Sequence, residues 1–257
     1  MSRIVRIRMS EKTFALFDDY RIGLSIFGGA RFKPGDPLRL SPDCRVEEYA
    51  NFTTGNMLPV ELGAFTYNNS PYIECARIGR YCSLAGGISL MGNDHPTDKI
   101  TSSPIGYRVS LPSFRRYLED RGITPAFSPF REKEKELTIG HDVWIGSGAL
   151  LARGITLGHG CIVAARSVVT KDVPPYAVVG GIPGRVIRKR FDEATCAALL
   201  ASKWWEHEPT IVHDVMSAPG ATLRDKLARV MDRAGSTPFA PRVLTGEEIV
   251  ASGTLLS

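Results

Sequence analysis

The chain lacks several features that define other classes of protein. No stretch of its 257 residues approaches the roughly 20 consecutive apolar residues that cross a bilayer, so we expect no membrane span. The segment Met1–Ser10 alternates arginine with aliphatic residues and has no apolar centre of the signal-peptide kind. The net charge of +5 is modest and no nucleic-acid-reading motif occurs, which disfavours a nucleic-acid partner.

A six-residue period is the dominant pattern. One series of aliphatic residues at this spacing contains Ile139, Ile145, Leu151, Leu157, Val163 and Val169. A second series, two residues upstream, contains Leu137, Val143, Ala149, Ile155, Cys161, Ser167 and Val173. This period fits neither a helix nor an ordinary strand. Three six-residue sides form an 18-residue coil, and stacked coils bury the aliphatic column that one repeat leaves exposed, so the pattern predicts a parallel β-helix.

The period divides the chain into segments. It recurs at Ile78, Leu84 and Leu90, and less regularly at Leu40, Val46, Phe52 and Leu58. We expect a β cap over residues 1–40, coils over 41–184 interrupted by an excursion loop at 91–136, and a helical extension over 185–257. Helices are predicted at 191–205, with Asp192 as N-cap, and near 221–234. The last twenty residues look loosely ordered or docked to a partner.

The cysteines give no sign of a metal site. The five are odd in number and show no Cys-x-x-Cys spacing, and Cys75, Cys82 and Cys161 fall within coils. We interpret them as reduced, core-filling residues of a cytoplasmic protein. His141 and His159 are 18 residues apart and should stack. Because no third ligand has a clear position, we interpret both as solvated histidines and expect no metal.

His95 is the candidate catalytic residue. It opens the excursion loop, in Gly92-Asn93-Asp94-His95-Pro96-Thr97-Asp98, and long loops inside compact repeats are commonly functional. An imidazole is suited to accept a proton near neutral pH. Asp94 or Asp98 is a candidate to orient its ring, although a turn role for each is equally plausible.

A candidate cofactor groove follows from the 18-residue coil. Residues 18 apart stack, so Ser147 lies over Ala165 and Arg153 over Lys171, with Arg185, Arg188 and Lys189 beyond the last coil. A lane of small side chains beside positive charge suits a long phosphorylated cofactor. The alternative is that the residues are small only because tight corners require it.

The chain resembles the hexapeptide-repeat acyltransferases of the xenobiotic acetyltransferase type. The matching segments are the coils, His95–Asp98 with Ser102-Ser103-Pro104, Val143–Gly146, Val173–Gly184 and Lys203-Trp204-Trp205. The resemblance implies a left-handed β-helix and a homotrimer with active sites between subunits. It also implies His95 as catalytic base and coenzyme A contacts at Ser147, Ala165, Thr170, Lys171 and Arg188. Ile182 and Gly184 depart from the asparagine and alanine common in the family.

The resemblance implies an acetyl-CoA-dependent acetyltransferase. We expect the acceptor to be a hydroxyl or amine of a sugar or nucleotide-sugar in surface-polysaccharide synthesis. An antibiotic acceptor of the chloramphenicol or streptogramin type is the alternative, and a non-catalytic scaffold is an alternative of another class. A zinc hydratase is disfavoured because no His-x₄-His pair occurs. The loop aromatics either stack on the acceptor or form the loop's own core: Tyr107, Phe114, Tyr117, Phe127 and Phe130.

Overall fold

The computed structural model describes residues 4–25, 31–71, 76–92, 94–108, 111–124, 130, 136–217, 219–234 and 238–256. The chain divides into two compact units. One contains Met1–Leu90 and Glu136–Ser257, and the other contains Met91–Lys135. We describe each unit separately.

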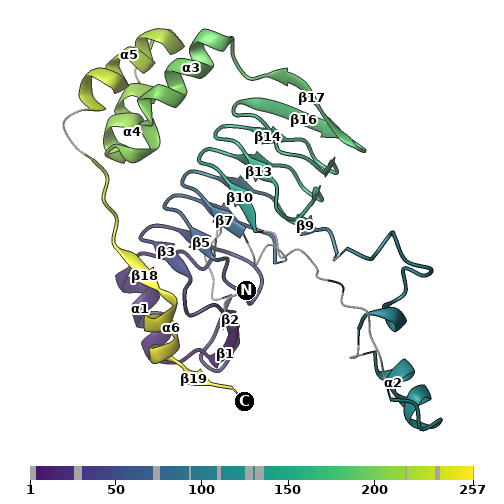
Figure 1. The fold of residues 1–257 in the computed structure, drawn as a ribbon. Helices are drawn as coiled ribbons and strands as arrows, with labels where there is room; N and C mark the ends of the chain where they lie inside the picture. The colour runs from purple at the N-terminus through teal and green to yellow at the C-terminus, as the bar shows by residue number, and fades with distance from the viewer. Residues whose placement is uncertain are drawn as a thin grey trace. The chain divides into compact units, whose positions relative to one another are not determined.

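Three sheets of short strands form the body of the larger unit (Figure 1). The first runs in spatial order β13 (Thr156–Leu157), β10 (Leu137–Ile139), β7 (Ala76–Ile78), β5 (Glu61–Leu62), β3 (Arg45–Glu47) and β18 (Val243–Thr245). The second runs β17 (Gly184–Lys189), β16 (Ala177–Gly181), β14 (Ile162–Val163), β11 (Trp144–Ile145), β8 (Ser83–Leu84), β6 (Tyr67–Asn68) and β4 (Asn51–Phe52). The third runs β15 (Val168–Val169), β12 (Leu150–Leu151) and β9 (Ser89–Leu90).

Strand register confirms the parallel sheets that the six-residue period predicts. Thr138 pairs with Thr156 and Leu150 with Val168, so neighbouring strands here are parallel and 18 residues apart. Every member of both aliphatic series is buried. The apolar column inside the coils is therefore the core of this unit, and it extends through the earlier positions Leu40, Val46, Phe52 and Leu58.

The first coils are shorter than the later ones. Glu61 pairs with Arg77 and Tyr67 with Ser83, a step of 16 residues rather than 18. This shorter step explains why the period is less regular in this part of the sequence. After the excursion, Leu137 pairs with Ala76, so β10 stacks directly on β7 and continues the coils.

Both ends of the chain build the cap of the first coil. Strand β1 (Val5–Arg8) lies between β2 (Pro37–Leu40) and β19 (Thr254–Leu255), and β18 pairs antiparallel with β3 (Figure 1). Helices α1 (Glu11–Asp19) and α6 (Gly246–Ser252) contact each other beside this sheet. Their contact includes a 2.6 Å hydrogen bond from the Ser10 hydroxyl to the Ser252 carbonyl.

Two expectations need correction here. The last twenty residues were expected to be loose or docked to a partner, yet 243–255 form two strands and a helix that pair with the N-terminal segment. The N-terminal segment also contains helix α1, where only strands were expected. Pairings between opposite ends of a chain leave no local pattern, which is why the sequence did not reveal them.

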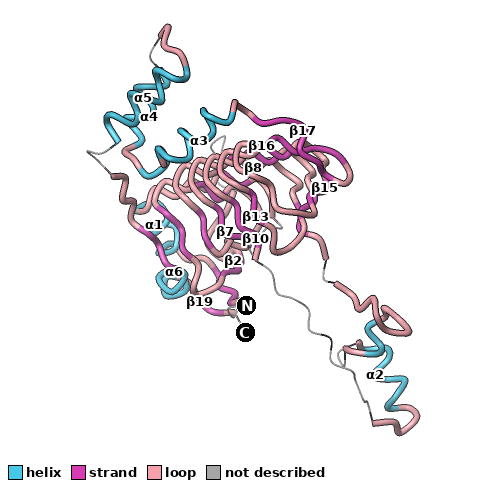
Figure 2. Tube along the Cα trace, turned by 45° about the horizontal axis from the view of Figure 1, so that its top comes forward, coloured by secondary structure: helices cyan, strands magenta, loops and turns pink. Residues whose placement is uncertain are grey.

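Helices follow the terminal hairpin of β16 and β17 (Figure 2). They are α3 (Glu193–Ser202), the 3₁₀ turn η2 (Trp204–Glu206), α4 (Pro209–Ser217) and α5 (Leu223–Ala234). The Asp192 carboxylate caps α3 by accepting from the Thr195 N–H at 2.7 Å, as predicted. Within the described part of the chain, no helix is long and apolar enough to cross a bilayer.

The smaller unit carries two helical elements. The 3₁₀ turn η1 (Pro104–Gly106) precedes α2 (Pro112–Glu119), whose Leu118 is buried. Both helical segments begin with proline, which suits the first helical position because its missing N–H would have no partner there. The turn η1 ends at Tyr107, whose N–H donates to the Pro104 carbonyl at 3.1 Å.

Candidate active site

His95 lies exposed in the smaller unit, with contacts to two later residues of the same loop. Its Nδ1 is 2.8 Å from the Ser102 carbonyl oxygen and 3.0 Å from the Tyr107 hydroxyl. Pro96, the next residue, is buried and anchors the backbone beside the ring. The turn that presents the Ser102 carbonyl is held by the Thr101 hydroxyl, which accepts from the Ser103 N–H at 3.1 Å.

The contact with Ser102 determines the tautomer of His95. A backbone carbonyl can only accept a hydrogen bond, so Nδ1 must carry the proton. In a neutral imidazole with Nδ1 protonated, Nε2 has the free lone pair. The ring therefore presents Nε2 as a proton acceptor, which is the form a general base requires.

The residues that hold the ring differ from those considered in the sequence. Asp94 and Asp98 were the candidates, but the contacts on Nδ1 come from Ser102 and Tyr107. The sequence reasoning missed the Ser102 carbonyl altogether. A backbone carbonyl carries no residue-type signal, and a contact seven residues along an irregular loop has no period from which to predict it.

The loop aromatics make contacts with one another inside the smaller unit. The rings of Tyr107 and Phe130 lie edge-on at 5.1 Å between centroids, and those of Phe114 and Tyr117 stack at 6.1 Å. These contacts favour the interpretation of the aromatics as the loop's own packing. Phe127 lies outside the described residues.

The structure brings Ser147 and Ala165 together in the larger unit. Ser147 follows β11 and Ala165 follows β14, and both are exposed at the same corner of successive coils. The Arg166 N–H donates to the Ser147 carbonyl at 2.9 Å, and the Ser147 hydroxyl donates to the Gly86 carbonyl at 3.0 Å. A Cβ on Gly146 would stand 2.8 Å from Ala165 Cα, so this close spacing requires glycine.

The candidate cations Lys171 and Arg188 lie in the last coil and the terminal hairpin of the larger unit. Thr170 and Lys171 directly follow β15 and are exposed, and pairing of Leu151 with Val169 places Arg153 one coil from Lys171. Arg188 is exposed on β17 and pairs with Val178, which pairs with Ile162. Sequence positions predicted to contact a phosphorylated ligand are therefore exposed and distributed along the last two coils and the terminal hairpin.

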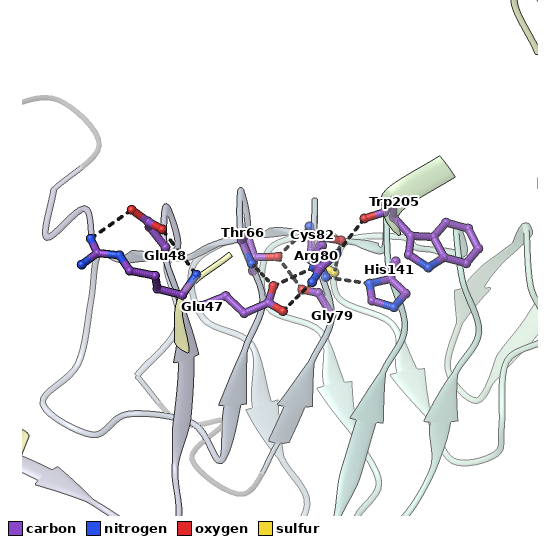
Figure 3. A network of polar contacts seen from close by, with 10 residues as sticks. Glu47, Glu48, Thr66, Gly79, Arg80, Cys82, His141 and Trp205 are labelled. Atoms are coloured by element: carbon purple, nitrogen blue, oxygen red, sulfur yellow. Dashed lines mark hydrogen bonds and ion pairs between the residues drawn. The ribbon is translucent and has the colours of Figure 1, made fainter. Parts of the chain in front are cut away.

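His141 and His159 are not the solvated residues that the sequence suggested. Their rings stack at 5.0 Å and 7°, and both lie against the Trp205 ring at 5.0 and 4.6 Å. Each Nδ1 accepts a hydrogen bond from the backbone of the coil below. That of His141 accepts from the Arg80 N–H at 2.9 Å (Figure 3), and that of His159 accepts from the His141 N–H at 3.0 Å. Burial and the charges of His159 and Arg80 lower the pKa of His141 to about 4. Burial also lowers the pKa of His159, against the charge of Glu206.

This arrangement makes the two histidines structural. A Nδ1 that accepts from a backbone N–H is unavailable to a metal, and the neutral rings pack a corner rather than face solvent. Among the described residues, no group of three or more His, Cys, Asp or Glu side chains is placed to hold a metal ion. The two rings stack on each other as expected, but they also pack against the Trp205 ring of η2 instead of facing solvent.

The described cysteines are buried thiols. Cys44, Cys82, Cys161 and Cys196 are free, and burial raises the pKa of Cys44, Cys82 and Cys161 to about 12. Thiols with so high a pKa are poor nucleophiles, which fits a core-filling role. Cys75 lies outside the described residues.

Comparison with known proteins connects this geometry to a family. Residues 137–171 match the family described as "Bacterial transferase hexapeptide (six repeats)". The chain is 38% identical over 154 residues to a chloramphenicol acetyltransferase of Agrobacterium fabrum (strain C58), which covers 54% of this chain and 69% of that relative. A galactoside O-acetyltransferase of Escherichia coli (strain K12) is 49% identical over 56 residues, 22% of this chain and 28% of the relative.

A solved structure is also similar. It is a hexapeptide-repeat acetyltransferase of Vibrio cholerae complexed with acetyl coenzyme A, at 26% identity and a TM-score of 0.36. The match covers 51% of this chain and 60% of that one. The buried six-residue series and the parallel coils define a hexapeptide-repeat protein. The 38% identity, which extends over 69% of the chloramphenicol acetyltransferase, shows that the chain belongs to the hexapeptide-repeat acyltransferases.

Proposed function

We propose that the protein is an acetyltransferase that uses His95 to move an acetyl group from acetyl-CoA to a small acceptor. The single observation that carries this proposal is the hydrogen bond between His95 Nδ1 and the Ser102 carbonyl, because it leaves Nε2 as a base. Membership of an acyltransferase family supplies the class of reaction.

The reaction is a direct transfer. Nε2 of His95 accepts the proton of an acceptor hydroxyl or amine, and the acceptor atom bonds to the thioester carbonyl carbon. The tetrahedral intermediate collapses, the carbon–sulfur bond breaks, and the imidazolium gives the proton that it took from the acceptor to the coenzyme A thiolate. Ser147 is a poor nucleophile for a covalent route, because its hydroxyl donates to a backbone carbonyl rather than to a base.

The donor would lie along the corner that contains Ser147 and Ala165. Both residues are small, exposed and one coil apart, so a thin chain can approach the backbone between them. Lys171 and Arg188 are exposed cations further along the unit, and they suit the phosphate groups of coenzyme A. Thr170 is adjacent to Lys171 and completes the proposed donor contacts.

We propose the left-handed β-helix and the homotrimer of the family for this chain. Support for an interface comes from the seven-stranded sheet, where Tyr67 and Trp144 both pair in register with Ser83 and both rings are exposed. Light scattering on purified protein should give three chains per particle, and Trp144→Glu should shift the mass toward one chain. A monomeric parent protein would refute the trimer.

Two acceptor classes follow from the relatives. The longer match is to a chloramphenicol acetyltransferase, which favours a hydroxyl-bearing antibiotic. The match to a galactoside O-acetyltransferase is shorter and favours a sugar, the acceptor that the sequence suggested. An acetyl-CoA thiol-release assay over antibiotics, plain sugars and nucleotide-sugars separates the two classes by their kcat/KM values.

The His95→Gln variant tests the base. General base catalysis contributes typically 10²–10⁴-fold, so kcat should fall by about that factor while coenzyme A still raises the Tm. His213→Gln is the matched control, since His213 is an exposed histidine of α4 and should leave kcat unchanged. Turnover of His95→Gln within a few-fold of the parent would refute the role of His95.

Coenzyme A binding separates the enzyme from a non-catalytic scaffold. A ligand that binds the folded protein raises its Tm in proportion to the logarithm of ligand excess. Coenzyme A should therefore stabilise the parent, and Arg188→Ala with Lys171→Ala should reduce the shift. Lys12→Ala, which removes an exposed cation of α1, is the control. No shift at millimolar coenzyme A would favour the scaffold.

A further inference from the structure

The hydroxyl of Tyr107 is a second contact on the ring nitrogen that carries the His95 proton. Its oxygen is 3.0 Å from Nδ1, while the Ser102 carbonyl oxygen is 2.8 Å from the same atom. The two rings meet edge-on, with centroids 6.3 Å apart and planes at 87°. One Nδ1–H group therefore has two oxygen acceptors, which is a three-centre hydrogen bond.

A second acceptor restrains the ring in a way that one acceptor does not. A ring held by a single N–H···O contact can still tilt about that contact. Two acceptors in different directions restrict the tilt and therefore fix the direction in which Nε2 points. The carbonyl contact selects the tautomer, because the Tyr107 hydroxyl alone could either donate to Nδ1 or accept from it.

Tyr107 is itself fixed on both sides. Its N–H donates to the Pro104 carbonyl at 3.1 Å and closes η1, and its half-buried ring lies edge-on to Phe130 at 5.1 Å. Aromatic pairs in this geometry are favourable beyond the area that they bury. The hydroxyl thus approaches His95 from a side chain that is braced by its own backbone and by a neighbouring ring.

We propose that Tyr107 is a positioning residue that holds the His95 ring in one orientation, in the tautomer that the Ser102 carbonyl selects, so that Nε2 is presented as the base. Its effect on turnover rests on the proposed function. Its effect on the His95 ring does not, so the ring can be measured whether or not an acceptor is known. This role also accounts for Tyr107 better than stacking on an acceptor, since its ring already packs against Phe130 and its hydroxyl contacts His95.

The test compares two tyrosines of the same unit by ¹⁵N NMR of histidine-labelled protein. Tyr107→Phe removes the hydroxyl but keeps the ring against Phe130. Tyr117→Phe removes a hydroxyl from the exposed ring that stacks on Phe114 and serves as the matched control. The His95→Gln variant assigns the His95 signals among the five histidines.

The parent should show Nδ1 protonated in one well-defined tautomer. Tyr107→Phe should keep this tautomer, because the Ser102 carbonyl remains, but it should shift and broaden the His95 ring signals as the ring becomes free to tilt. It should also lower kcat about two- to tenfold, the value of one hydrogen bond, with little change in the KM for acetyl-CoA. Tyr117→Phe should match the parent in both measurements. Phe130→Leu, which weakens the brace without touching His95, should give a smaller change in the same direction.

The inference is overturned if Tyr107→Phe leaves both the His95 ring signals and the rate as they are in the parent. If Tyr107→Phe does not fold, Phe130→Leu decides by the same two readouts. Full activity of His95→Gln would instead refute the proposed function, and the His95 ring signals would still decide the role of Tyr107.

Discussion

Arg80 and Glu47 form a two-point ion pair across the coils, with Nε to Oε2 at 2.7 Å and the second guanidinium nitrogen to Oε1 at 2.8 Å. Glu47 lies in β3 and Arg80 follows β7, two strands away in the same sheet. Arg80 also donates to the Trp205 carbonyl at 3.1 Å (Figure 3). Glu47 accepts from the Ala64 N–H at 2.9 Å. This network ties the early coils to the turn η2.

Breaking the pair should destabilise the larger unit. The Arg80 and Glu47 side chains are 15% and 21% exposed, so Glu47→Gln leaves a poorly solvated charge on Arg80. We expect a loss of about 2 kcal/mol in the free energy of unfolding, less than for a fully buried pair. The control is Glu193→Gln, whose partner is Lys189 and whose side chain is 81% exposed, with an expected loss below about 0.5 kcal/mol. Urea unfolding measures both, and equal losses would contradict the prediction.

The Glu47 pair should also make stability depend on acid. Burial alone would raise the pKa of Glu47, but the hydrogen bonds from Arg80 and Ala64 and the charge of Arg80 outweigh it and lower that pKa. A lowered carboxyl pKa stabilises the fold above the unfolded value of 4.5, and this contribution is lost as pH falls through the lower folded value. In unfolding curves below pH 4.5, Glu47→Gln should lose less stability than the parent. If the stability of Glu47→Gln and of the parent fell equally with pH, the lowered pKa of Glu47 would be contradicted.

His141 should remain neutral far below the usual range for histidine. Its pKa is lowered from 6.5 to about 4, chiefly by burial. Because the unfolded chain takes up this proton first, stability should fall as pH drops from about 6.5 toward about 4. NMR titration of His141 gives the midpoint, and a value near 6.5 would contradict the stacked, buried ring. His141→Phe should flatten the stability profile in this window, whereas His213→Gln should not.

Glycine at position 79 should be required by the spacing of the coils. A Cβ there would stand 2.7 Å from the Gly140 carbonyl oxygen and 2.8 Å from His141 Nδ1. Gly79→Ala must push two coils apart, at a cost of about 1–3 kcal/mol. Gly86→Ala is the control in the same coil, because its Cβ would meet only the Asn69 carbonyl oxygen at an ordinary 3.6 Å. Thermal unfolding should separate the two variants, and similar Tm values would count against this account.

Strand β18 should stabilise the N-terminal cap. Leu244 of β18 is fully buried beside β3, so Leu244→Ala should cost about 2–5 kcal/mol. Leu255 of β19 is 62% exposed, and Leu255→Ala should cost far less. Hydrogen exchange should show the larger effect on the amides of β1 and β3. Equal protection in the two variants would mean that the C-terminal segment does not support the cap.

Much of the fold was predictable because it repeats. Between Leu137 and Val173, aliphatic residues recur every six positions, so each repeat forms the same short strand and turn. The buried series, the parallel sheets and their 18-residue register therefore followed from the sequence. The pairing of Ser147 with Ala165 followed from the same arithmetic. The early coils were read less well, because their 16-residue step weakens the period.

The candidate site was only partly predictable. His95 became a candidate because it opens the one long interruption of the repeat in the sequence, but the loop that follows has no period. Its contacts with Ser102 and Tyr107 depend on how that irregular chain turns. His141 and His159 were predicted to stack, whereas their burial depends on Trp205, a residue of the helical segment that packs onto the coils.

The sequence by itself determined the parallel coils, their buried column and the family, because a short period constrains every repeat through contacts between neighbours. Tertiary structure alone decided the return of residues 243–255 to the N-terminal cap, the neutral histidine stack and the tautomer of His95. The first two features arise from contacts between segments far apart in the sequence, and the third from the way one irregular loop turns. No repeating pattern of residues encodes either kind of contact.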